Sequence, residues 1–183
     1  MADFSVDRTS SGAGSFVSVV IIFFNAERFL AEAVDSVLAQ TWRDWELLLV
    51  DDGSRDTSSG LARRYAAGQP DRIRYLEHRD HDNLGRSASR NLGAAHARGR
   101  WLTFLDSDGV WIPQHLERQV DLLGRHPEAE AAYGPAMWWF TWDAQTHTPD
   151  HVQDIGVQPA SSSRRLLRRC SSTEARPHPA SAA

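Results

Sequence analysis

Three clusters of polar side chains directly follow apolar, strand-like runs in this sequence. They are Asn25, the tetrad Asp51-Asp52-Gly53-Ser54 and the triplet Asp106-Ser107-Asp108. Carboxylate oxygens at a strand end can accept hydrogen bonds from a ligand, and Gly53 permits a tight turn or a close ligand approach. Two acids one residue apart offer the hard oxygen ligands that Mg²⁺ or Mn²⁺ prefers, with substrate phosphates as co-ligands. Because ligands bind beyond the carboxyl ends of parallel strands, we expect one shared site.

Apolar periodicity predicts the elements that bring these clusters together. β-Branched and aromatic runs predict strands at 16–24, 45–50, 73–77 and 101–105, with further strand material at 131–133 and 137–142. Apolar residues at helical spacing predict helices between the strands. Their expected boundaries are Asn25 as an N-cap, Asp56 or Thr57 as a second cap, a helix from Ser87 to Arg98 closed by Gly99, and a start at Pro113. This alternation predicts an α/β fold with a doubly wound, mostly parallel sheet.

Composition divides the chain into three parts. Residues 1–15 are rich in Ser, Gly and Asp and predict a flexible leader, whereas residues 16–142 predict one globular domain. Residues 143–183 predict an irregular or disordered tail. From about Pro159 this tail is dominated by Ser, Ala, Arg and Pro, the composition expected of coding sequence read out of frame after a frameshift.

Charge and hydropathy exclude several classes of protein. A formal net charge of −4 gives no reason to expect nucleic-acid binding. No apolar stretch approaches the ~20 residues of a transmembrane helix, and the N-terminus lacks the pattern of a secretory signal. The single cysteine, Cys170, cannot form a disulfide framework. We therefore expect a cytoplasmic protein, with peripheral contact to the inner membrane surface through a partner.

Five segments with a fixed order carry a family pattern. They are VSVVIIFFN (17–25), SVLAQTW (36–42), ELLLVDDGS (46–54), NLGRSASRNLG (83–93) and ARGRWLTFLDSD (97–108). Together they resemble the family 2 inverting glycosyltransferases with the GT-A fold. The resemblance covers roughly residues 16–142 and implies the nucleotide-sugar-binding portion of that fold, truncated before the acceptor-binding half.

The resemblance also implies a donor, an acceptor and a metal. The donor would be a UDP- or dTDP-sugar, and the acceptor a hydroxyl of a saccharide or lipid-linked molecule, as in cell-surface polysaccharide biosynthesis. Asp52 is expected to bind the nucleobase, with residues 22–25 lining its pocket, while Asp106 lies near the ribose. Asp108 and Asp106 are expected to bind Mg²⁺ or Mn²⁺. The nucleotide-sugar-binding set is Ile22, Phe24, Asn25, Glu27, Asp52, Arg86, Arg90, Asp106 and Ser107.

Two arginines and one histidine-rich loop allow alternative interpretations. Arg86 and Arg90 are expected to steer the diphosphate, and the alternative is that they are solvated surface arginines. His78 and His81, with Asp80 and Asp82, could suggest a metal cluster. Their spacing fits no standard metal site, so a solvated loop is the favoured interpretation.

The general base marks the main departure from the family. In the family it is an Asp or Glu of the second half, and nothing in residues 143–183 resembles its motif. The catalytic residue is therefore not assigned, and we expect donor binding with weak or absent transfer. One alternative is a non-catalytic nucleotide-binding module that acts through a partner chain or an oligomer. Another is a nucleotidyltransferase, against which Asn25-Ala26-Glu27-Arg28 stands in place of a glycine-rich loop.

Overall fold

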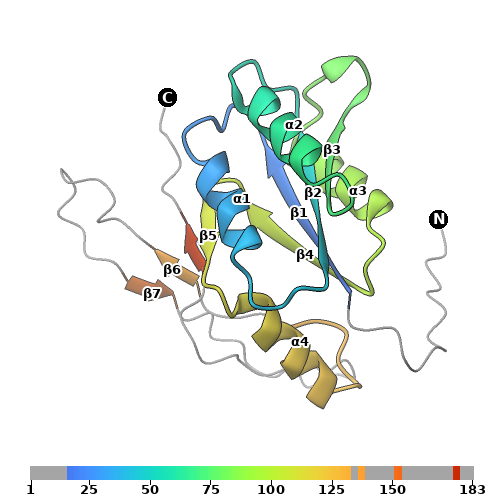
Figure 1. Cartoon of the computed structure of the whole chain (residues 1–183), viewed down its shortest axis with the longest axis vertical. Helices are drawn as coiled ribbons and strands as arrows, with labels where there is room; N and C mark the ends of the chain where they lie inside the picture. The colour runs from blue at the N-terminus through green and yellow to red at the C-terminus, as the bar shows by residue number, and fades with distance from the viewer. Residues whose placement is uncertain (1–15, 133–135, 139–150, 154–174, 178–183) are drawn as a thin grey trace.

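A parallel four-stranded sheet forms the centre of the computed structural model, which describes residues 16–132, 136–138, 151–153 and 175–177 (Figure 1). The strands lie in the order β3-β2-β1-β4. Their bounds are Val17–Phe23 for β1, Trp45–Asp51 for β2, Ile73–Glu77 for β3 and Trp101–Asp106 for β4. All three pairings are parallel, so the carboxyl ends of the strands share one edge. The predicted doubly wound α/β fold is confirmed.

Helices cover both faces of this sheet. The helices are α1 (Leu30–Leu38), α2 (Ser58–Gly68), α3 (Arg86–His96) and α4 (His115–Arg125). Side chains alternate along β1: Val19 and Ile21 pack with α1, α2 and α4, whereas Val20 and Ile22 pack on the face that α3 covers. Burial on both faces explains why β1 and β2 read as continuous apolar runs.

A glycine lets α3 lie close to the sheet. A Cβ at Gly93 would fall 2.5 Å from Cγ1 of Val20 and 3.3 Å from a methyl carbon of Val50. No side chain larger than hydrogen fits there unless the helix moves away. The position of Gly93 therefore sets the distance between α3 and the sheet, and with it the position of the helix start near the strand ends.

A buried carboxylate ties the other end of the sheet to the α3–β4 connection. Glu46 is 3% exposed, and its Oε1 accepts hydrogen bonds from the Ser18 hydroxyl at 2.6 Å and the Arg98 N–H at 2.7 Å. Its Oε2 accepts one from Arg74 at 2.7 Å. Burial alone would raise the pKa of Glu46, but these hydrogen bonds and the Arg74 charge outweigh burial and lower it. The carboxylate thus stays ionised and fixes the return of the chain into β4.

Three predicted helix boundaries differ from the structure. Asn25 does not cap a helix: its φ is 50°, and α1 begins at Leu30 after a turn in which Ala26 O accepts the first hydrogen bonds. The third helix ends at His96, so Gly99 is not its cap; a Cβ at Gly99 would lie 2.5 Å from Ser18 N, which explains the glycine as a close approach. The fourth helix begins two residues after Pro113. Capping residues such as these are local sequence features, and tertiary contacts determine where each helix actually begins or ends.

A second, small sheet contains strands from late in the sequence. Its order is β5-β8-β6-β7, with bounds Gly109–Trp111, Ala136–Trp138, His151–Gln153 and Ala175–Pro177 for β5, β6, β7 and β8. β7 and β8 fall within 143–183, where the sequence predicts irregular structure. The sequence does not indicate these two strands, because three residues are too few to show the alternating pattern of a strand. Residues 131–132 form no strand. The predicted leader at 1–15, residues 139–142 and most of the predicted tail lie outside the described residues.

None of the described helices has both the length and the apolar character that crossing a bilayer requires.

The close approach at Gly93 gives a stability prediction. Gly93→Ala should lower the free energy of unfolding by roughly 1–3 kcal/mol, because the added methyl overpacks the α3–sheet contact. Urea unfolding followed by circular dichroism measures the change. Gly124→Ala is the matched control: it is also helical, its Cβ would meet nothing within 4 Å, and it should stabilise α4 by about 0.5–1 kcal/mol. Equal effects of the two substitutions would contradict the packing argument.

Candidate nucleotide site at the strand ends

The register of the sheet places the three polar clusters along one edge. Ile22 of β1 pairs with Val50 of β2 on one side and with Asp106 of β4 on the other. β2 and β4 are therefore separated by one strand, or roughly 10 Å. Asn25 follows β1 directly between them. Acids on β2 and β4 lie on the same rim, within the reach of one extended ligand.

The adjacent acids Asp51 and Asp52 have different environments. Asp51 is fully buried, and its Oδ1 accepts a hydrogen bond from Ser54 N–H at 2.8 Å. Its Oδ2 accepts one from the Ser59 hydroxyl, and the Tyr75 hydroxyl lies 2.9 Å from the same oxygen. Burial, followed by hydrogen bonds to Glu77 and Asp51, raises the pKa of Tyr75, so its hydroxyl stays protonated. Asp51 is thus used to join β2, α2 and β3.

Asp52 faces the loop before α3. Its Oδ1 accepts hydrogen bonds from the backbone N–H groups of Leu84 at 2.9 Å and Gly85 at 3.0 Å, and the side chain is 8% exposed. His78 Nε2 lies 3.7 Å from the same oxygen and 2.8 Å from the hydroxyl of the buried Ser89. Among the described residues, no hydrogen bond reaches Oδ2 of Asp52. One carboxylate oxygen is therefore fixed by the loop, and the other is not held by it.

Gly53 brings the same loop onto the strand end. Its φ is 79°, and a Cβ there would lie 2.8 Å from both Asn83 N and His81 O. The loop includes the 3₁₀ turn η1 (Arg79–His81), with φ of 60° at Asp80 and 57° at His81. Non-glycine residues with positive φ cost free energy, so tertiary contacts must hold this loop in place.

Asn25 and Glu27 connect the β1 end to α2. Asn25 N–H donates to the Ser54 hydroxyl at 3.1 Å, and its side-chain oxygen accepts from Arg55 N–H at 2.8 Å. Glu27 Oε2 accepts from the Thr57 hydroxyl at 2.9 Å, while Glu27 N–H donates to Asp56 at 3.0 Å. Asp56 also accepts from Ser58 N–H, so it contributes to the start of α2 as the sequence predicts. These polar atoms of Asn25 and Glu27 therefore form hydrogen bonds within the protein that hold the end of β1 against the start of α2.

At the β4 end the charged groups are open to solvent. Asp106 and Arg90 form an ion pair at 3.2 Å, with side chains 68% and 43% exposed. The Arg90 guanidinium also lies 5.9 Å from the centroid of the Phe104 ring. Ser107 and Asp108 occupy the half-buried turn between β4 and β5. Within the described ranges, no group of three or more His, Cys, Asp or Glu could hold a metal, so any ion would need ligands from elsewhere, such as phosphates.

The remaining predicted residues divide by exposure. Ile22 is 9% exposed and packs with Val20 and Val50, so its side chain supports the site from within the core. Phe24 is 49% exposed beside Asn25, on the rim. Arg86 is exposed and forms the first residue of α3, one position after the Gly85 amide that contacts Asp52.

The interpretation of 78–85 as a solvated loop is wrong for His78 alone, since His81 and the rest of the loop are half-exposed or exposed. His78 has an 8% exposed side chain beside Asp52. His81 lies between two partners, with Nδ1 2.8 Å from Glu77 Oε2 and Nε2 2.7 Å from Ser54 O. These contacts depend on the loop folding over Gly53. The sequence signal that could have indicated this was Gly53 itself, which implies a close approach by some other segment.

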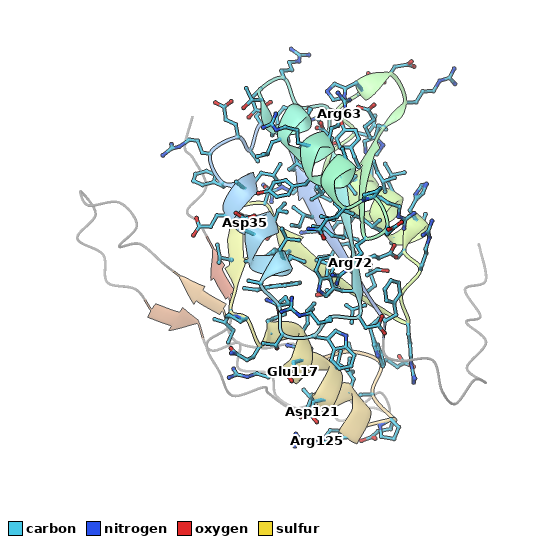
Figure 2. All side chains as sticks on the ribbon, viewed as in Figure 1. Asp35, Arg63, Arg72, Glu117, Asp121 and Arg125 are labelled. Carbon is cyan, nitrogen blue, oxygen red and sulfur yellow. The ribbon has the colours of Figure 1, made fainter. Side chains whose placement is uncertain are left out.

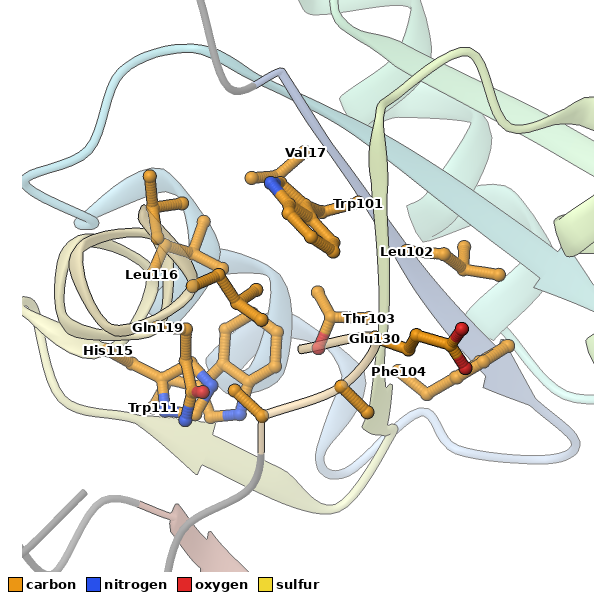
Figure 3. Close-up of a pocket in the computed structure, with 14 residues that line it drawn as sticks. Val17, Trp101, Leu102, Thr103, Phe104, Trp111, His115, Leu116, Gln119 and Glu130 are labelled. Carbon is orange, nitrogen blue, oxygen red and sulfur yellow. The ribbon is translucent and has the colours of Figure 1, made fainter. Parts of the chain in front are cut away.

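A cavity lined by both apolar and polar side chains lies elsewhere, between β4 and α4 (Figure 3). It has a volume of about 260 Å³, and Trp111 and His115 stack on its wall with ring centroids 4.2 Å apart. None of the residues predicted to bind a nucleotide sugar or a metal lines it. The described cavity is therefore separate from the acidic rim.

Comparison with known proteins identifies relatives of this sequence. The family model described as Glycosyl transferase family 2 matches residues 18–169, which extends beyond the predicted limit at 142. EpsE of Bacillus subtilis, named as a glycosyltransferase, is 39% identical over 114 residues. That alignment covers 62% of this chain and 40% of EpsE, so the chain spans less than half the length of this curated relative.

Solved structures share the fold at low sequence identity. TarS of S. aureus, in a crystal structure of residues 1–349 with UDP-GlcNAc, matches with a TM-score of 0.56 at 23% identity, covering 61% of this chain and 32% of TarS 1–349. The mannosyltransferase PcManGT from Pyrobaculum calidifontis, in complex with GDP-Man and Mn²⁺, matches with a TM-score of 0.53 at 22% identity, covering 67% and 35%. At these identities the likeness establishes the GT-A fold alone.

The contact between Gly53 and the loop gives a second prediction. Gly53→Ala should lower the free energy of unfolding by roughly 2–4 kcal/mol, because it combines a positive φ with a clash against Asn83 N and His81 O. Gly85→Ala is the control for backbone strain without a clash: its φ of 86° and ψ of 165° lie in a region that is essentially restricted to glycine, but its Cβ would meet nothing within 4 Å, so it should cost about 1–3 kcal/mol. Urea unfolding measures both, and faster hydrogen exchange at Leu84 should appear in Gly53→Ala alone. Similar exchange in both variants would contradict the proposed contact.

Proposed function

The chain belongs to glycosyl transferase family 2, and we propose that its strand-end rim binds the nucleotide of a UDP- or dTDP-sugar. The observation that carries this proposal is the state of Asp52. The carboxylate is buried, and the loop amides hold one of its oxygens, while the other has no hydrogen-bond partner among the described residues. The second oxygen of this largely buried carboxylate is available to accept a hydrogen bond from a ligand N–H, such as that of a uracil or thymine base.

Apolar groups beside Asp52 support placement of a planar base. Phe24 is 49% exposed next to Asn25, which is bonded to Ser54 of the Asp52 turn. Leu84 is 59% exposed, and its own N–H donates to Asp52. Exposed aromatic and apolar side chains near a hydrogen-bonding carboxylate offer faces against which a base could pack.

The diphosphate would then extend from Asp52 toward Asp106 and Asp108. Two carboxylates with phosphate and water as co-ligands form a donor set that fits Mg²⁺ or Mn²⁺. A bound divalent ion would neutralise charge on the leaving diphosphate. Arg86 and Arg90 lie on α3 beside this path and would supply positive charge to the phosphate oxygens. Transfer of the sugar to an acceptor hydroxyl, with attack opposite the leaving diphosphate, would invert the anomeric carbon.

Calorimetry tests nucleotide binding directly. We expect UDP or dTDP to bind more tightly than GDP, with an affinity that Mn²⁺ increases. Asp52→Asn should weaken binding by roughly 10- to 100-fold, because it removes a hydrogen bond to a charged group. Asp108→Ala should abolish the increase due to Mn²⁺ while leaving metal-free binding intact.

A distant acid supplies the control for both variants. Asp121 pairs with Arg125 on α4, at the end of the molecule away from the strand ends, and Asp121→Asn should bind UDP as the wild type does (Figure 2). If Asp52→Asn binds UDP with the affinity of the wild type, the proposal is wrong.

The role of Arg86 can be separated from that of the base pocket. Arg86→Gln should weaken UDP binding by roughly 3- to 10-fold at low salt, since it removes one partly screened charge beside the diphosphate. Uridine, which has no phosphate, should bind both forms equally. Calorimetry with the two ligands at 50 mM and 300 mM salt measures the effect. A matching loss for uridine would show that Arg86 acts on the fold and not on the diphosphate.

A second candidate function is a nucleotide-binding module that acts through a partner chain. The observation in its favour is the 41% exposure of both Leu102 and Phe104 on β4, the outer strand of the described parallel sheet. Sedimentation of the purified chain distinguishes the two. A dimer or a captured partner that is required for UDP binding would favour the module, whereas a UDP-binding monomer would favour the donor-binding domain.

A further inference from the structure

His81 has contacts that only its protonated ring can satisfy. Its Nδ1 lies 2.8 Å from Glu77 Oε2, and its Nε2 lies 2.7 Å from the carbonyl oxygen of Ser54. A carbonyl oxygen and an ionised carboxylate only accept hydrogen bonds. Both ring nitrogens must therefore donate, which requires the imidazolium form.

The surrounding charges favour that form. Hydrogen bonds from the ring to Ser54 O and then to Glu77, with the negative charges of Asp51 and Glu77, raise the pKa of His81 above its ordinary 6.5 against weak desolvation. Burial would raise the pKa of Glu77, but hydrogen bonds from Tyr75 and His81 and the charge of Arg63 lower it. The charged or titratable groups on the elements around the His81 ring are Asp51 on β2, Asp52 and Arg55 on the turn that carries Ser54, Glu77 and Tyr75 on β3, Arg63 on α2, and His78, Arg79, Asp80 and Asp82 on the loop itself.

The same residue links this charge to Asp52. The backbone at His81 has φ of 57°, and its carbonyl oxygen lies against Gly53. Three residues later, Leu84 N–H donates to Asp52. His81 therefore joins the ends of β2 and β3 to the loop segment that fixes the Asp52 carboxylate.

We propose that His81 is a positioning residue: its imidazolium clamps loop 79–85 onto the Gly53–Ser54 turn and so holds Asp52 in the arrangement that binds the nucleotide. This proposal rests on the function proposed above and adds a pH dependence to the same site. The ring does not touch the ligand, and it acts through the Leu84 and Gly85 amides.

The sign of the pH dependence follows from the direction of the pKa shift. Because the pKa of His81 is raised in the folded loop, the contribution of the clamp is complete below pH 6.5 and is lost as pH rises through the raised value. Loss of one charge-assisted hydrogen bond corresponds to roughly a 10-fold effect. UDP affinity should therefore fall by about that factor between pH 6 and pH 8.5.

Variants of His81 test this dependence by calorimetry with UDP across that range. His81→Gln should bind UDP at every pH as weakly as the wild type does at high pH. His81→Arg keeps the positive charge and two donors, so its affinity should stay near the low-pH value throughout. His96→Gln, which removes an exposed histidine of α3, should behave as the wild type, and comparison among variants cancels the titration of UDP itself.

A ligand-free measurement separates this proposal from the proposed function. In an NMR titration of the full chain, the amide resonances of Leu84 and Gly85 should shift with the midpoint of the His81 ring. The clamp is overturned if the amide shifts do not change at the midpoint of the His81 ring. It is also overturned if His81→Gln binds UDP with the affinity and the pH dependence of the wild type. Absence of UDP binding at all pH values, with amides that follow His81, overturns the proposed function instead.

Discussion

At the carboxyl end of β2, the fully buried carboxylate of Asp51 joins three elements that are distant in the sequence. It accepts hydrogen bonds from Ser54 N–H in the turn and from the Ser59 hydroxyl on α2, and the Tyr75 hydroxyl of β3 lies 2.9 Å away. A buried anion is tolerated only when such partners are present. The conformation of the Asp52–Ser54 turn, and therefore every feature of the rim that depends on it, follows from satisfying this one charge.

Side chains alternate in direction along a strand, so the two adjacent acids face different parts of the protein. Asp51 points to the face of α2, whereas Asp52 points to the loop before α3, because neighbouring residues of a strand face opposite sides. Gly53 then has to be glycine, since the loop backbone fills the space of a side chain. The Asp-Asp-Gly sequence thus combines an internal anchor, a carboxylate at the site and a contact surface for the loop. A single substitution in it would disturb more than one of these roles.

The sequence predicts all four strands of the main sheet. Burial on both faces produces the long apolar runs of the central strands β1 and β2, whereas the partly exposed β3 and β4 show shorter runs of β-branched, aromatic and other apolar residues. The shared rim follows from the same argument, since parallel strands end at one edge. The sequence could not show which of Asp51 and Asp52 is structural, because both follow the same strand. It also missed His78 and His81, whose environments depend on a loop that folds over Gly53 from another part of the chain. Contacts of that kind leave no periodic pattern.

The contrast between the two ends of the rim bears on how a charged ligand could enter. Around Asp52 the carboxylate is buried and its loop is fixed, so the groups proposed to bind a base are in place without the ligand. Asp106 pairs with Arg90, and the two side chains are 68% and 43% exposed; exposed ion pairs of this kind are worth about 0–1 kcal/mol. A divalent ion or a diphosphate could therefore displace Arg90 from Asp106 at little cost and leave the guanidinium for phosphate oxygens. Under the proposed function, a fixed carboxylate beside an easily exchanged ion pair would suit a ligand that binds first through its base and orders its charged portion afterwards.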